Sequence, residues 1–159
     1  MSKIVVIDAS LAAMWAVPET YSNQALVLAN QWAQEHTRLI APCLMLTEVT
    51  NAFYKRVARR EMELDTGIAA LHVVLEFGIE IHEEPGLHSR AMELSHQLKR
   101  PTTYDCHYLA LAEIRNCELW TGDERFYNSV KETMDQVKWI GNYAPPPRPN
   151  PPSLPVRSS

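Results

Sequence analysis

Four acidic side chains stand at positions where a folded protein normally places apolar or capping residues: Asp8, Glu48, Asp105 and Asp123. Burying a carboxylate is costly unless a positive charge compensates it. Four such groups in one place therefore predict bound divalent cations, and oxygen ligands favour Mg²⁺ or Mn²⁺ over zinc. A site of this kind can activate water for the hydrolysis of a phosphodiester bond.

The elements that must position these acids alternate along the chain. Short runs rich in β-branched residues predict strands at about 3–8, 38–41, 78–82, 118–121 and 137–140. Longer segments with helical periodicity lie at about 20–36, 43–60, 64–76, 86–99, 103–115 and 124–133. This alternation predicts an α/β fold with a parallel sheet that is covered by helices on both faces.

Such a sheet would bring the four acids to one edge. The carboxyl ends of parallel strands open on the same edge, where Asp8 and Asp123 both leave predicted strands. Helical spacing relative to Met45 places Glu48 on the stripe that faces the sheet. Asp105 lies near the start of its helix, where the helix dipole favours the ionised form. We therefore expect the four carboxyl groups to converge within reach of one or two ions.

Each acid also has a purely structural interpretation. Asp8 could cap a segment that begins near Ser10, Asp105 could be an ordinary first-turn acid, and Asp123 could cap the following segment. Glu48 is harder to explain in this way, because an inward glutamate in an apolar helical stripe has no structural role of low cost. The metal-site hypothesis therefore rests on the four acids occurring together.

Composition indicates one globular domain at residues 1–143 and a tail at residues 144–159. A chain of 159 residues, 46% of them hydrophobic, can bury one sizeable core. The tail has seven prolines in sixteen residues and is expected to be extended or disordered, as a solvated terminus or as a partner-docking segment. The apolar runs are too short to span a membrane and no signal peptide is evident, so we expect a cytoplasmic location.

The segments around the four acids resemble the motifs of PIN-domain ribonucleases, in particular the VapC-type toxins of bacterial and archaeal toxin–antitoxin pairs. These segments are 6–10 (VIDAS), 46–52 (LTEVTNA), 104–112 (YDCHYLALA) and 119–126 (LWTGDERF). The resemblance covers roughly residues 3–140, and its specificity comes from the order and spacing of the motifs. It implies a PIN-like three-layer α/β/α fold with a central parallel sheet of about five strands.

The resemblance also implies a function. The chain would be a divalent-metal-dependent endoribonuclease in which the four acids are catalytic and hold Mg²⁺ or Mn²⁺. Ser10, Asn51 and Thr121 match positions that support the acids or the metal by hydrogen bonding. The expected partners are an RNA substrate, an antitoxin that covers the acidic groove, and a second copy in a homodimer. The proline-rich tail lies outside the family pattern and leaves the partner open.

An RNA substrate would have to meet a local basic patch, because the net charge of the chain is −4. The candidate contacts are four cations that continue the helix of Glu48 and one that follows Asp123: Lys55, Arg56, Arg59, Arg60 and Arg125. The alternative is a solvated helix end whose cations favour the helix dipole.

Other classes of protein fit the sequence less well. A PIN-fold module that binds RNA or protein with little turnover is disfavoured by the intact acids. A haloacid dehalogenase-type phosphotransferase also has an aspartate after its first strand, but it requires a second aspartate where Ser10 stands. Rossmann and P-loop enzymes are disfavoured because Ala9, Ser10 and Leu11 replace the glycine-rich loop.

Overall fold

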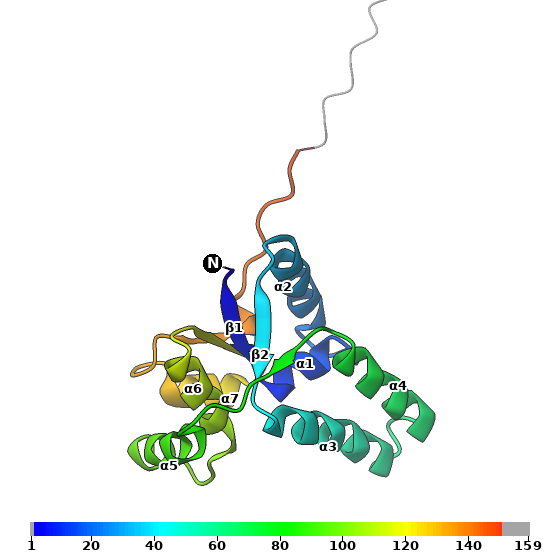
Figure 1. Cartoon of the computed structure of the whole chain (residues 1–159). Helices are drawn as coiled ribbons and strands as arrows, with labels where there is room; N and C mark the ends of the chain where they lie inside the picture. The colour runs from blue at the N-terminus through cyan, green and yellow to red at the C-terminus, as the bar shows by residue number, and fades with distance from the viewer. Residues whose placement is uncertain (1, 151–159) are drawn as a thin grey trace, which may run out of the picture.

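A computed structural model describes residues 2–150, which form an all-parallel sheet with helices packed around it (Figure 1). The strands are β1 (Ile4–Ile7), β2 (Arg38–Ala41), β3 (Glu80–Ile81), β4 (Glu118–Thr121) and β5 (Val137–Trp139). The helices are α1 (Ala9–Met14), α2 (Ser22–Gln34), α3 (Leu44–Ala58), α4 (Leu64–Leu75), α5 (Leu87–Gln97), α6 (Tyr104–Ile114) and α7 (Glu124–Val130), with a 3-10 turn η1 (Ile140–Asn142) after β5.

The strand order determines where a site can form. The sheet has the order β3-β2-β1-β4-β5, so the chain builds outward from β1 in one direction and then returns to build in the other. Val6 of β1 is paired with Ile40 of β2 on one side and with Leu119 of β4 on the other. The order thus reverses between β1 and β4, and ligands of α/β sheets bind beyond the strand ends at such a reversal.

Helices cover the sheet on both faces. In Figure 1, α2, α3 and α4 lie on one side of the strands, and α5 and α6 lie on the other. Val5, Val6 and Ile7 of β1 are fully buried, because a strand in the middle of a covered parallel sheet has no solvent face. The predicted α/β fold, with a five-stranded parallel sheet between helical layers, is confirmed.

Two elements differ from the sequence prediction. Helix α1 was not predicted, because it has only six residues and its last four are all buried, which leaves no polar face to reveal a helical period. Strand β3 has two residues where five were predicted. It is an edge strand, and natural sheets commonly keep their edges short.

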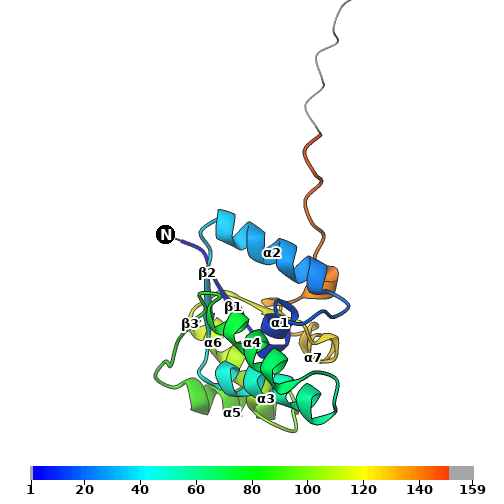
Figure 2. The same cartoon turned by 90° about the vertical axis from the view of Figure 1, so that its right-hand side faces the viewer.

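The C-terminal segment continues beyond η1. Residues 144–150 have no regular secondary structure and lead away from the sheet and helices (Figures 1 and 2). The remainder of the predicted tail, residues 151–159, lies outside the described residues. Within residues 2–150, no helix has the length and apolar character needed to cross a membrane.

Candidate metal centre

Asp8 is the most buried acid of the candidate site, with 6% of its surface exposed. It lies between β1 and α1, and its Oδ1 accepts hydrogen bonds from Ser10 Oγ at 2.7 Å and Leu11 N at 2.9 Å. The hydroxyl of Thr121 donates to Oδ2. Burial raises the pKa of Asp8 to about 6 despite these hydrogen bonds, and the charge of Asp105 adds to the rise. Asp8 is therefore both the cap of α1 and a buried acid at the sheet edge.

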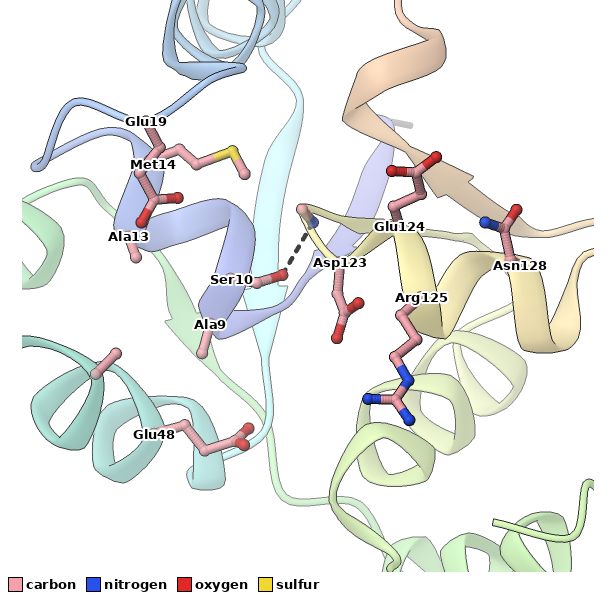
Figure 3. Close-up of a pocket in the computed structure, with 12 residues that line it drawn as sticks. Ala9, Ser10, Ala13, Met14, Glu19, Glu48, Asp123, Glu124, Arg125 and Asn128 are labelled. Atoms are coloured by element: carbon pink, nitrogen blue, oxygen red, sulfur yellow. Dashed lines mark hydrogen bonds between the residues drawn. The ribbon is translucent and has the colours of Figure 1, made fainter. Parts of the chain in front are cut away.

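Asp123 is placed beside Asp8 by the pairing of β1 with β4. The buried Thr121 connects the two acids, because its hydroxyl donates to Asp8 and accepts a hydrogen bond from Asp123 N at 2.9 Å. Asp123 is exposed, and its Oδ1 caps α7 by accepting from Phe126 N at 3.0 Å. Figure 3 shows its carboxylate pointing into the pocket at this edge of the sheet.

Glu48 reaches the site from α3. Its Oε1 accepts a hydrogen bond of 2.6 Å from the hydroxyl of Tyr108, a residue of α6 that is 2% exposed. Burial raises the pKa of Glu48, and the negative charge of Asp105 raises it further. The hydrogen bond from Tyr108 lowers this pKa but does not cancel the rise. Tyr108 thus holds an inward-facing glutamate between two helices that cover opposite faces of the sheet.

Asp105 lies in the first turn of α6. Its Oδ2 accepts a hydrogen bond of 3.0 Å from Arg100 Nη2 in a salt bridge. Burial raises the pKa of Asp105, Arg100 opposes the rise, and the charge of Asp123 adds to it. The charge of Asp105 also raises the pKa of Asp8 and of Glu48, so Asp105 interacts with each of the other three acids.

The charge of Asp105 interacts unfavourably with that of each of the other three acids. Among residues 2–150, no three acidic, histidine or cysteine side chains are arranged to hold a metal ion as they stand. The expected convergence on one or two ions is therefore not met by these side-chain conformations. The physical reason is that Glu48 and Asp105 are each hydrogen-bonded to another side chain of the protein. Arg100 offsets this repulsion only in part, since the pKa of Asp105 stays raised beside it. An all-oxygen donor set of this kind has the chemistry that suits Mg²⁺ or Mn²⁺.

Two neighbouring cavities meet at Glu48, and neither is lined by Asp8 or Asp105. The first, of about 790 Å³, is bordered by Ser10, Glu48, Asp123 and Arg125 (Figure 3). The second, of about 430 Å³, also touches Glu48 and follows α3; its lining includes Asn51, Lys55, Arg56 and Arg59. Arg56 is engaged in a salt bridge with Glu19, whereas Lys55 and Arg59 are exposed. Of the basic residues named from the sequence, Arg60 lines neither cavity.

The hydrogen-bonding residues named by resemblance occupy different places. Ser10 and Thr121 both donate to Asp8, and Ser10 Oγ also accepts from Gly122 N at 2.9 Å. Asn51 is exposed and lines the second cavity, one turn of α3 beyond Glu48. Ser10 and Thr121 thus act on the buried acid, and Asn51 faces the path along α3.

Sequence reasoning missed two residues that hold the acids. Tyr108 lies three residues after Asp105 on the same helical face, so its spacing was a usable signal. Arg100 gave no such signal, because Pro101 separates it from the helix that it contacts.

A family model described as PIN domain matches residues 22–138. No curated protein matches the chain. The fold is similar to that of PAE2754 from Pyrobaculum aerophilum, with a TM-score of 0.61 and 20% identity over 89% of this chain and 93% of that one. It is also similar to VapC20 of Mycobacterium tuberculosis, a toxin that cleaves the sarcin–ricin loop, with a TM-score of 0.57 and 14% identity over 82% and 95%.

Proposed function

Because the chain belongs to the PIN domain family, we propose that it is a divalent-metal-dependent endoribonuclease. Members of this family are in general metal-dependent nucleases. The observation that carries the proposal is the buried Asp8 at the strand-order reversal, with a pKa raised to about 6 and three more acids nearby. The proposed ligands of Mg²⁺ or Mn²⁺ are Asp8, Glu48, Asp105 and Asp123.

The residues of the chain have distinct tasks in this proposal. Ser10 and Thr121 fix the orientation of Asp8, and Tyr108 fixes that of Glu48. The chemistry that a bound cation supplies is polarisation of the phosphoryl oxygen and activation of a water for in-line attack. Arg125 would contact the RNA backbone in the first cavity, and the cations of α3 would contact it in the second.

The test of this function is RNA cleavage by the purified full chain with and without metal. We expect cleavage in Mg²⁺ or Mn²⁺, none in excess EDTA, and recovery when the metal is restored. The products should carry a 5′-phosphate and a 3′-hydroxyl. Cleavage that persists in EDTA would contradict the proposal.

A binding-only function is the second candidate. It is favoured by one observation, that Glu48, Asp105 and Asp123 already have partners within the protein. If the protein binds RNA or another protein tightly but cleaves no RNA in Mg²⁺ or Mn²⁺, the binding-only function replaces the proposed nuclease function.

We propose further that the enzyme is the cytoplasmic toxin of a toxin–antitoxin pair, with a nuclease domain at 1–143 and a separate tail at 144–159. The likeness in fold to a toxin supports this role. An antitoxin covering the acidic groove would place an arginine or lysine among the carboxylates. A homodimer is supported by exposed apolar side chains on α3 and α4, which include Tyr54, Leu64 and Ile68.

Removing two cations of the second cavity should weaken RNA binding without stopping the chemistry. We expect the double variant Lys55→Ala, Arg59→Ala to raise KM about tenfold at low salt while kcat stays within about twofold. RNA binding should also depend less on salt: the slope of the logarithm of the binding constant against the logarithm of the salt concentration should decrease in magnitude by about 1 to 2.

The control for this prediction is the double variant Lys131→Ala, Lys138→Ala, which removes the same charge outside both cavities. Equal loss of binding in the two double variants would mean that net charge, and not a path along α3, determines affinity. Fluorescence anisotropy with a labelled RNA at several salt concentrations measures the difference.

A further inference from the structure

Arg100, in the connection between α5 and α6, is held in place by three partners. Its Nη2 donates to Asp105 Oδ2 at 3.0 Å, and its Nη1 donates to Ser129 Oγ of α7 at 2.8 Å. Its guanidinium carbon lies 5.4 Å from the centroid of the Phe126 ring, within the range of a cation–π contact. The side chain is 20% exposed. Arg100 is therefore a fixed and largely buried cation at the edge of the acidic group.

The partner of Asp105 differs in kind from those of the other three acids. Asp8 and Asp123 accept from hydroxyl and backbone N–H groups, and Glu48 accepts from a phenol. Among residues 2–150, Asp105 is the one acid of the four that has a salt bridge. Arg100 therefore places a positive charge directly against Asp105, the acid whose own charge acts on Asp8 and Glu48.

We propose that Arg100 is a built-in counter-ion that occupies the Asp105 side of the acidic group in the metal-free protein and competes with the divalent cation. This inference rests on the proposed function, because it takes Asp105 as a metal ligand. Two cations at one carboxylate repel each other, and the repulsion is strong where water is largely excluded. Metal binding therefore requires Arg100 to release Asp105, and Arg100 keeps the affinity for metal low.

The opposite role would be that Arg100 positions Asp105 as a ligand, since a carboxylate can bind metal with one oxygen and an arginine with the other. The geometry favours competition. Arg100 Nη2 already occupies Asp105 Oδ2 at 3.0 Å, and the arginine side chain is only 20% exposed. The contacts of Arg100 with Ser129 and Phe126 also fix it in place independently of Asp105. The two roles predict opposite changes in metal affinity when Arg100 is neutralised.

The experiment measures Mn²⁺ binding to the metal-free full chain, without RNA, by titration calorimetry or by the electron paramagnetic resonance of free Mn²⁺. We expect Arg100→Gln to lower the Kd for Mn²⁺ at least tenfold. The matched control is Arg90→Gln, which also removes an arginine from a salt bridge to α6, at Glu113, but outside the acidic group. Its Kd should match that of the wild type.

Ser129→Ala provides a second variant, which keeps the charge of Arg100 and removes one of its anchors. We expect its Kd to fall about two- to fivefold, and this measurement decides the matter if Arg100→Gln does not fold. An unchanged or raised Kd for Mn²⁺ in the variant that folds would overturn the counter-ion role. If the wild type nevertheless binds Mn²⁺, the proposed nuclease function is not affected by that result. If the wild type binds no Mn²⁺, binding by Arg100→Gln would still support the counter-ion, and no binding by either would overturn it together with the metal site.

Discussion

Replacing Asp8 with asparagine is expected to abolish RNA cleavage and, at neutral pH, to stabilise the metal-free protein. The loss should reach at least about 1,000-fold in kcat/KM, because a neutral amide cannot replace a carboxylate beside a divalent cation. The stabilisation follows from burial, which raises the pKa of Asp8 from 3.8 to about 6. A shift of this size corresponds to roughly 3 kcal/mol at most, so a gain of about 1 to 3 kcal/mol in the free energy of unfolding is expected.

The stability that Asp8→Asn gains depends on pH. The folded-state pKa of Asp8 lies above its unfolded value, so the folded protein binds the proton more tightly. The cost of ionising Asp8 is absent below about pH 4, grows as the pH rises from 3.8 to about 6, and is complete above that. The pKa values of Glu48 and Asp105 are raised as well and act in the same direction. Metal binding has the opposite dependence, because it requires ionised carboxylates.

Urea unfolding of metal-free protein at pH 5 and pH 7.5 tests the stability change, and RNA cleavage tests the function. Asp8→Asn should be more stable than the wild type at pH 7.5, and the difference should shrink at pH 5. Asp135→Asn, at an exposed acid before β5, is the control and should change neither property. If Asp8→Asn were less stable at pH 7.5, its hydrogen bonds with Ser10 and Thr121 would outweigh the cost of burying its charge.

The fold could be predicted from the sequence because the hydrophobic residues of its helices and strands recur with the period of each element. Each of the five predicted strands and six predicted helices has a counterpart in the structure, with ends that differ by a few residues. Helix α1 was missed because Leu11, Ala12, Ala13 and Met14 are all buried and produce no alternation of polar and apolar residues. The acids at the sheet edge were found because the carboxyl end of a parallel strand can be located from its apolar run.

The side chains that hydrogen-bond to Glu48 and Asp105 could not be predicted from the periodicity of the sequence. The hydrogen bond between Glu48 and Tyr108 joins residues 60 apart on two helices, and its formation depends on how α3 and α6 pack against the sheet. Arg100 contacts Asp105 while Ser129 and Phe126 of α7 also contact its guanidinium, so this pair depends on where α7 packs. Sequence periodicity locates side chains on a face of an element, whereas these contacts depend on rotamers in the assembled protein.

Gly122 lies between Thr121 and Asp123, where the backbone after β4 passes close to α1. A Cβ at this position would lie 2.7 Å from Met14 Cε and 3.0 Å from the backbone carbon and oxygen of Ser10. The methionine end can move aside, but the backbone of Ser10 cannot move without shifting the hydroxyl that holds Asp8. Gly122→Val should therefore cost about 1 to 3 kcal/mol of stability by overpacking.

The same displacement should lower cleavage per folded molecule by about 100-fold, because a shift of about 1 Å in a positioning group has an effect of this size. Gly141→Ala is the matched control, since its Cβ would meet the ring of Trp139 at 2.3 Å, in the turn after β5. The control should lose stability but keep its activity per folded molecule, with the folded fraction measured by circular dichroism. Similar activity in both variants would show that the contact between Gly122 and Ser10 only stabilises the fold and does not position Asp8.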